Sequence, residues 1–260
     1  MDEIIEIEYN ELTLRLDKEE NVYVVVDCDK DVTSVKLPIK VDGIYIGRIG
    51  EKAFENCRQL KSFEFPDYED EDYLEGTLIS EIEGNAFYGC SSLEEIEIPY
   101  SVTVIGWGAF ARCSALKKAT FRDEYIYIAP YAFSDCESLA EVTRVSDANE
   151  GVFDGCDSLK YLPITDDIDE ICESAFAHCQ GLEHIVIPKS VERIEMLAFR
   201  SCYNLKTVKF EADGGWYVYF GLGHPTYDLD LSDPAENARR LSRMDFDDGV
   251  RYWARKKRRG

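Results

Sequence analysis

The stretch from Ile82 to Pro99 has the sequence I-E-G-N-A-F-Y-G-C-S-S-L-E-E-I-E-I-P, and the motif A-F-x-x-C-x-x-L at its centre decides the fold. The motif occurs seven times, although one copy carries Val152 in place of the Ala. From Phe87 onward the copies are 23 residues apart except for one step of 20, and the first step is 33. Such a period is typical of a solenoid, in which each coil buries its apolar side against the next. The copies centre on Phe54, Phe87, Phe110, Phe133, Phe153, Phe176 and Phe199.

Within one repeat the apolar spacing changes from strand-like to helix-like. Ile96 and Ile98 alternate with acidic residues, which predicts a short strand with both isoleucines facing inward, and Pro99 ends it. Residues 102–105 carry a second inward pair, and residues 109–116 have helix-like spacing over about two turns. We therefore expect each coil to contain a strand, a second extended piece and a short helix. The strands would stack as a parallel sheet, with the helices covering its other face.

The composition excludes several classes of protein. The chain has 260 residues, of which 45% are hydrophobic, as in ordinary folded proteins. Its net charge of −23 argues against broad nucleic-acid binding and is compatible with a cationic partner or a solvated acidic surface. No apolar run reaches the roughly 18 residues of a membrane span. The acidic start lacks the features of a secretory signal, so the sequence as written predicts a cytoplasmic protein, or a surface or secreted one if an upstream segment is missing.

Seven of the nine cysteines follow a repeat Phe by three residues. Equivalent positions in adjacent coils lie roughly 4.8 Å apart, inside the range of a disulfide, but stacked side chains point the same way. We therefore predict a ladder of reduced, buried thiols, with Cys28 and Cys172 outside it. No C-x-x-C and no ligand-spaced His pair occurs, so no metal or cofactor is expected. The ladder consists of Cys57, Cys90, Cys113, Cys136, Cys156, Cys179 and Cys202.

The full pattern I-G-x-x-A-F-x-x-C-x-x-L-x-x-I-x-I-P-x-S-V-x-x-I resembles the BspA-like leucine-rich repeat family of bacterial and some protist surface proteins. Residues 97–102 and 186–191 match it closely, and the resemblance covers roughly residues 22–211. It implies a right-handed curved solenoid that binds proteins or surfaces and has no catalytic residues. The expected fold is an α/β leucine-rich-repeat solenoid with a parallel β-sheet on the concave face, short helices on the convex face and caps at both ends.

Both ends depart from the repeat and are expected to cover the open ends of the core. The first cap is predicted to hold two short strands, one near residues 5–9 and one at residues 22–26. Asp233 before Pro234 is an N-cap pattern that predicts a helix start. The basic tail from Arg251 either binds nucleic acid or an anionic membrane, or docks on the cap. The predicted divisions are a β-rich N-terminal cap (1–31), the solenoid (32–210), and a C-terminal cap with an aromatic strand, a short helix and the tail (211–260).

Two departures from the period have functional interpretations. An insertion of ten residues lies between Pro66 and Ile79, and insertions in solenoids form loops that often belong to the binding face. Its acids could hold a cation or a basic partner, although the order of a known calcium loop is missing; the alternative is a solvated loop. The short copy around Phe153 predicts a local bend, or else ordinary drift of the repeat. The acids of the insertion are Glu69, Asp70, Glu71 and Asp72.

The outward-facing strand positions form the candidate binding face. Tyr161, His184 and Val186 make an aromatic and apolar spot of the kind found in interface cores. The alternative is an unspecialised solvated sheet. The predicted partner-binding residues are Glu95, Glu97, Lys118, Thr120, Glu141, Thr143, Tyr161, His184 and Val186.

These features predict a monomeric, non-enzymatic repeat protein that binds a protein partner of unknown identity through its solenoid surface. The alternative is an exported cell-surface adhesin or host-binding module whose signal is absent from the sequence. An enzyme is disfavoured, because no G-x-S-x-G, P-loop, G-x-G-x-x-G or H-E-x-x-H motif occurs. Only a depressed thiol pKa would make the pair of Cys172 and His178 a catalytic candidate.

Overall fold

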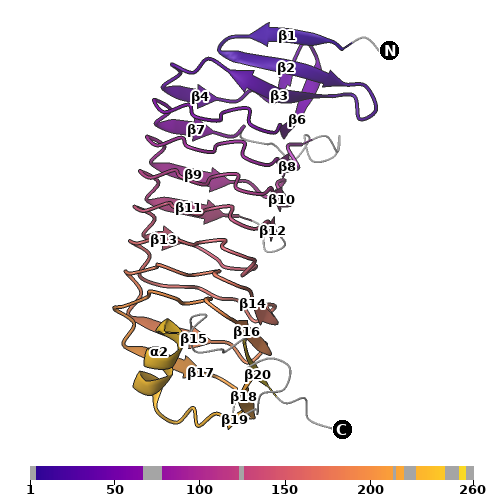
Figure 1. Cartoon of the computed structure of the whole chain (residues 1–260). Helices are drawn as coiled ribbons and strands as arrows, with labels where there is room; N and C mark the ends of the chain where they lie inside the picture. The colour runs from indigo at the N-terminus through magenta and orange to yellow at the C-terminus, as the bar shows by residue number, and fades with distance from the viewer. Residues whose placement is uncertain are drawn as a thin grey trace.

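The computed structural model describes residues 4–66, 78–122, 126–212, 215–219, 227–243 and 252–255. Figure 1 shows one elongated stack in which successive coils place short strands in two columns. The first column contains β4 (Ser34–Lys36), β7 (Ser62–Glu64), β9 (Glu95–Ile98), β11 (Lys118–Phe121), β13 (Glu141–Val142), β15 (His184–Ile187) and β17 (Thr207–Phe210). The second column contains β6 (Ile44–Ile49), β8 (Glu81–Ile82), β10 (Val104–Ile105), β12 (Tyr127–Ile128), β14 (Glu170–Ile171) and β16 (Arg193–Glu195).

Successive coils pair their strands in parallel, as the period predicts. In the first column β4, β7, β9, β11 and β13 form one five-stranded sheet, and β15 pairs with β17. Between β9 and β11 the register joins Glu95 to Lys118 and Ile98 to Phe121, an offset equal to the repeat. Inward residues therefore meet inward residues along the stack, and the predicted parallel sheet is confirmed.

The A-F-x-x-C-x-x-L segments are turns, and the prediction of short helices in them is wrong. In every copy the residue before the Ala position and the residue before the Cys have positive φ, as Asn85 (56°) and Gly89 (71°) do. Left-handed residues do not continue an α-helix. The backbone instead bonds to the next coil, since Phe87 N–H donates to the carbonyl of Ala109 at 2.7 Å. Within the described ranges α2 (Pro234–Ser242) is the only α-helix.

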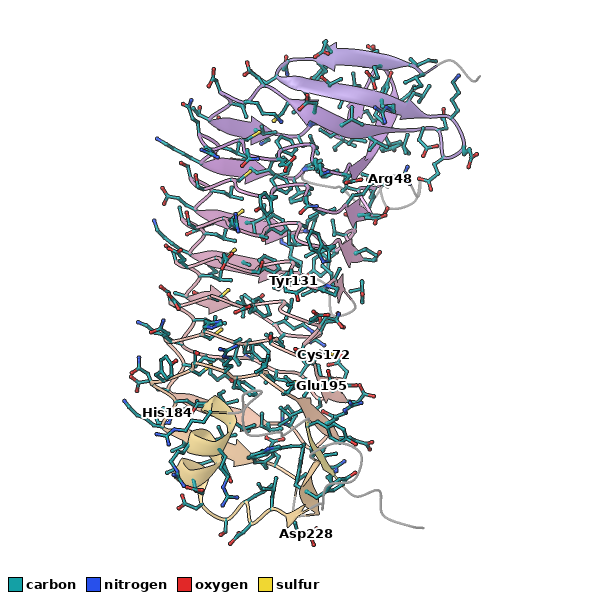
Figure 2. The ribbon with its side chains drawn as sticks, viewed as in Figure 1. Arg48, Tyr131, Cys172, His184, Glu195 and Asp228 are labelled. Atoms are coloured by element: carbon teal, nitrogen blue, oxygen red, sulfur yellow. The ribbon has the colours of Figure 1, made fainter. Side chains whose placement is uncertain are left out.

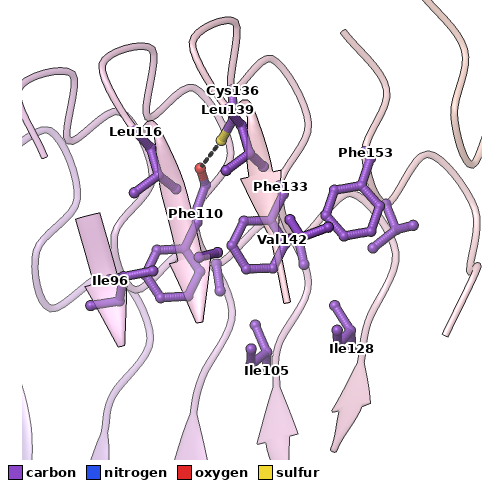
Figure 3. Close-up of a cluster of buried hydrophobic side chains, with 14 of the residues drawn as sticks. Ile96, Ile105, Phe110, Leu116, Ile128, Phe133, Cys136, Leu139, Val142 and Phe153 are labelled. Atoms are coloured by element: carbon purple, nitrogen blue, oxygen red, sulfur yellow. Dashed lines mark hydrogen bonds between the residues drawn. The ribbon is translucent and has the colours of Figure 1, made fainter. Parts of the chain in front are cut away.

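The repeat phenylalanines form a continuous stack through the core. All seven side chains are fully buried. From Phe54 to Phe199 the centroids of neighbouring rings are 4.9, 5.0, 5.1, 5.5, 5.9 and 5.4 Å apart, and the rings are close to parallel. Figure 3 shows Phe110, Phe133 and Phe153 in one row. The motif therefore describes a core and not a chemical site.

The ladder cysteines have a structural task. Each thiol from Cys90 to Cys202 donates to the carbonyl of the repeat Phe in the preceding coil, at distances of 3.0 to 3.2 Å. Figure 3 marks the bond from Cys136 to Phe110. All nine cysteines are free in the structure. The thiol thus supplies a hydrogen-bond donor to a buried carbonyl. A larger aliphatic side chain at this position would supply none.

Both columns are interrupted at the shortened coil around Phe153. The sheets ending in β12 and β13 do not continue into β14 and β15. An isolated pairing of Val145 with Ile164 lies between the first-column parts. The turn ladder still crosses the interruption, because Phe133 N–H donates to Val152 and Phe153 N–H donates to Ala175, both at 2.9 Å. The core is therefore continuous where the sheets are not.

Side chains replace the missing strand at this interruption. The Asp147 carboxylate accepts the N–H of Ile128 at 2.9 Å, and the Asn149 amide donates to the Ile128 carbonyl at 2.7 Å. The Thr143 hydroxyl accepts the N–H of Phe121 at 2.9 Å. Burial raises the pKa of Asp147. These contacts satisfy backbone groups of Phe121 and Ile128 that no neighbouring strand pairs with.

Three antiparallel strands precede the first coil: β1 (Glu6–Tyr9), β2 (Leu12–Asp17) and β3 (Val22–Cys28). The sequence predicted two strands here, and β2 was missed. β3 runs parallel to β6, so this end continues the second column; β5 (Lys40–Val41) also pairs with β6. Arg48 connects these strands to the first coils. Its guanidinium forms ion pairs with Asp17, with Glu20 at 3.2 Å and with Glu83 at 3.5 Å.

The other end closes with β18 (Trp216–Tyr219), β19 (Tyr227–Asp228), α2 and β20 (Tyr252–Arg255). β20 pairs antiparallel with β16 and β18. Trp216 and Trp253 are buried against Phe210. Asp233 is the N-cap of α2, as its pattern predicts. The division at residues 31/32 and 210/211 and the right-handed curvature stay predictions.

Candidate protein-binding face

All nine predicted binding residues lie along the first column or its extension through the interruption. Glu95, Lys118 and Glu141 are aligned across β9, β11 and β13, and Glu97 is aligned with Thr120. His184 and Val186 occupy alternate outward positions on β15, whose burial alternates along the strand. Figure 2 places His184 on the first-column side of the stack and Cys172 on the opposite side.

The N-terminal part of this face is charged but internally paired. Lys118 lies 3.0 Å from Glu141, Arg122 lies 2.5 Å from Glu97, and the hydrogen bond to Glu141 raises the pKa of Lys118. A shallow depression of about 770 Å³ spans β7, β9 and β11, with Phe65 and Pro66 among its lining residues. Because these exposed charges neutralise one another, the region exerts little net attraction on a charged partner.

The middle of the face is occupied by structural contacts. The Thr143 hydroxyl is used at the edge of β11. Arg144 pairs with Asp167 at 3.2 Å across the interruption. Thr143 is therefore a structural residue, and its predicted binding role stays a prediction.

The C-terminal part of the face contains a hollow of about 720 Å³ with both apolar and charged lining residues, which we call the Tyr161 hollow. Tyr161 is 66% exposed and Val186 is 45% exposed, although both side chains are large and apolar. His184 lies beside them, with its Nδ1 2.8 Å from the Thr207 hydroxyl. The residues that line the hollow are Arg144, Tyr161, Leu162, Ile164, Thr165, Asp166, Asp167, Val186, Pro188 and Glu211.

Most residues of the hollow were missed from the sequence. Residues 161–164 occupy the position where a regular repeat has its strand, Pro163 lies within it, and Asp166 and Asp167 follow it. No regular strand forms at this position, where Ile164 makes the isolated pairing with Val145, and its residues line the hollow together with Val186. The combination of Pro163 with the step of 20 residues was the available signal.

The other candidate features give no chemical site. Burial raises the pKa of Cys172 to about 11, the opposite of what a nucleophilic thiol needs. His178 pairs with Asp154 at 2.8 Å. Among the described residues no group of three or more His, Cys, Asp or Glu side chains could hold a metal ion. The acidic insertion, with Glu69, Asp70, Glu71 and Asp72, and most of the basic tail lie outside the described residues.

Residues 27–143 and 143–214 match the description BspA type Leucine rich repeat region, in 6 copies. The chain belongs to the BspA-type leucine-rich repeat family. A comparison with curated proteins found no match. None of the helices in the described ranges has the length and apolar character needed to cross a bilayer.

Two solved structures resemble this BspA-type repeat protein. A leucine rich cell surface protein from Faecalibacterium prausnitzii is 25% identical with a TM-score of 0.67; the alignment covers 89% of this chain and 60% of that one. A leucine-rich repeat protein from T. pallidum is 23% identical with a TM-score of 0.52, over 68% of this chain and 91% of that one. The second likeness shows the fold alone. This chain spans 60% of the length of the F. prausnitzii protein.

Proposed function

We propose that this chain is a non-enzymatic binding protein that holds a protein partner on the outward side of its first column. The observation that carries the proposal is the Tyr161 hollow. It places the exposed Tyr161 ring and the exposed Val186 side chain beside acidic residues, where the first column has no continuous sheet. Apolar groups left open to water in this way are stabilised when a partner covers them.

The chemistry of the hollow favours a partner with an apolar anchor beside basic residues. Tyr161 and Val186 supply the apolar contact, and aromatic residues are enriched in the energetic centres of interfaces. Asp166 and Glu211 lie at the same hollow, whereas its Arg144 is already paired with Asp167. Together with the net charge of −23, this acidic rim attracts a positively charged surface and repels an acidic one.

The remaining predicted residues have a supporting role in this proposal. Glu95, Glu97 and Lys118 extend the face toward the N-terminus, where paired charges would set the orientation of a long partner rather than its affinity. A curved solenoid would wrap such a partner on its concave side. The acidic insertion at residues 67–77 would add a contact for a basic segment.

The test uses three immobilised proteins: wild type, the double variant Tyr161→Asp/Val186→Asp, and the control Tyr203→Asp, whose side chain is 75% exposed outside the hollow. Each is incubated with an extract of the native organism, and bound proteins are quantified by mass spectrometry. We expect a basic protein that wild type and control capture equally and the double variant captures at least tenfold less. Equal capture by all three proteins, with unchanged melting temperatures, contradicts the proposal.

A second candidate function is that of an exported surface protein. It is favoured by the likeness to the F. prausnitzii protein, which is described as a leucine rich cell surface protein. Brief protease treatment of intact cells of the native organism would release peptides of an exposed protein before cytosolic markers appear in the medium. Peptides that are released only after cell lysis rule this candidate out.

A further inference from the structure

Cys28 and Cys57 are an exception to the pattern of the thiol ladder. Their sulfur atoms lie 2.7 Å apart, and both residues are buried. This separation is well inside the contact distance of two unbonded sulfurs and approaches the length of about 2.05 Å of a disulfide bond. In the next coils the thiols are directed at carbonyls instead, as that of Cys90 is directed at Phe54.

The position of Cys57 in the stack explains the exception. Each ladder thiol points toward the N-terminal neighbour of its coil, where it meets the carbonyl of a repeat Phe. Cys57 belongs to the first copy of the motif, so no repeat Phe precedes it. The place of that carbonyl is taken by the end of β3, which carries Cys28.

The backbone also explains why these two side chains face each other. Leu60 N–H donates to the Cys57 carbonyl, and Val32 N–H donates to the Asp29 carbonyl in the same way. The strands that follow are in register, with Val35 opposite Phe63. Asp29 is therefore the equivalent of Cys57 in the preceding layer, and Cys28 lies one residue earlier. The Cys28 side chain therefore leaves the backbone in a different direction from that of a stacked equivalent residue. The objection that stacked side chains point the same way does not apply to this pair.

We propose that Cys28 and Cys57 form a disulfide that fastens the three N-terminal strands to the first repeat coil, while the remaining seven cysteines stay reduced. The bond would close a loop over residues 28–57 and restrict the unfolded chain. It would act at the same end as the ion pairs of Arg48 with Glu20 and Glu83. This inference is independent of the proposed partner binding.

The oxidant in the proposed reaction is a small-molecule disulfide such as oxidised glutathione. Cys57 first gives its proton to water and becomes the attacking thiolate. It attacks one sulfur of the oxidant, whose S–S bond breaks and releases a thiolate. That thiolate takes the proton of Cys28, whose sulfur attacks Cys57 and expels the second half of the oxidant. Two electrons pass to the oxidant, which leaves as one thiol and one thiolate, and this thiolate takes from water a proton equal to the one that Cys57 released.

Access to Cys57 decides when the bond forms. The residue is fully buried and Cys28 is 6% exposed, so the oxidant reaches them only while β3 is separated from the first coil. The bond therefore forms during folding and is protected afterwards. The test accordingly starts from the unfolded full-length chain, refolded in buffers of reduced and oxidised glutathione and then alkylated under denaturing conditions.

We expect peptide mapping of the wild type to show one link, from Cys28 to Cys57, with seven alkylated cysteines. Cys172→Ser, which changes a half-buried thiol outside the ladder, keeps the link, and Cys28→Ser loses it. Reduction lowers the melting temperature of the wild type and of Cys172→Ser by about 5–10 °C and leaves that of Cys28→Ser unchanged. Nine alkylated cysteines in the oxidised wild type, or a mixture of links between other cysteines, overturns the proposal without requiring any variant to fold.

Discussion

Replacing Phe153 by Ala should divide the molecule into two units that unfold separately. Its ring lies between Phe133 and Phe176, at 5.5 and 5.9 Å, and is fully buried. Neither column has a continuous sheet at this coil. The stacked rings, the turn ladder, the thiol–carbonyl bonds, the pairing of Val145 with Ile164 and the ion pair of Arg144 with Asp167 are among the described contacts that carry cooperativity across it. Stability in a solenoid is approximately a sum over coils and their interfaces, so weakening one interface uncouples its neighbours.

The size of the effect follows from the burial. Removing a fully buried Phe ring costs about 3–5 kcal/mol through lost transfer energy and the cavity left behind. Phe110→Ala is the matched control, because its ring is equally buried and its neighbours lie at 5.0 and 5.1 Å. There the sheets are continuous, since β9 pairs with β11 and β10 pairs with β12. Both variants should lose a similar free energy of unfolding, but only Phe153→Ala should lose the single transition.

The three tryptophans provide the assay. Trp107 lies before the interruption, whereas Trp216 and Trp253 lie in the C-terminal elements. Urea unfolding is followed by fluorescence in a Trp107→Phe background and in a Trp216→Phe/Trp253→Phe background. For Phe153→Ala the two backgrounds should give different urea midpoints. The free energy of unfolding should also depend less steeply on urea concentration than in the wild type, because each unit exposes less surface on unfolding than the whole chain does. Coincident midpoints for Phe153→Ala, or a loss below about 1 kcal/mol, would refute the reasoning.

Three further predictions concern single side chains. Arg48→Met removes the contacts to Glu20 and Glu83 and should lower the free energy of unfolding by about 1–2 kcal/mol, with a smaller loss at high salt; an equal loss at all salt concentrations contradicts the ionic explanation. Asp147→Asn should raise the melting temperature at pH 7, because a buried acid with a raised pKa loses its stabilising contribution as pH rises through that pKa. The gain in melting temperature should vanish below about pH 4, and a gain that is the same at all pH values would contradict this explanation. Ser174→Gly should stabilise the protein by about 0.5–1 kcal/mol, since Ser174 has a φ of 59°; a destabilised variant in urea titration would show that the turn is not strained.

The fold was predictable because one pattern is repeated in sequence and in space. The alternation at Ile96 and Ile98 predicts the strand, and its recurrence after 23 residues predicts the parallel register. The turns were not predictable from apolar spacing, since A-F-x-x-C-x-x-L fits both a helix and a turn. The left-handed positions are occupied by residues as different as Asn56, Arg112 and Leu197. Their conformation is imposed by hydrogen bonds to the next coil, which a single repeat does not reveal.

The candidate site was predictable only where the period holds. Tyr161 and Val186 were identified as outward residues by counting along the repeat, and the structure places them at one hollow. Ile164 and Asp166 were missed because they lie where the strand pattern fails at Pro163. The positions of such residues depend on how neighbouring coils close around the shortened one, which is a property of packing rather than of local sequence.

The most direct test of the proposed function is hydrogen–deuterium exchange of this chain in complex with the captured partner. Amides at residues 141–145, 161–167 and 184–188 should gain protection, because they surround the Tyr161 hollow on the outward side of the first column. The A-F-x-x-C-x-x-L turns should be unaffected, since their contacts are with neighbouring coils. Protection confined to these turns, to the second column or to α2 would contradict the proposal that the partner binds the first column.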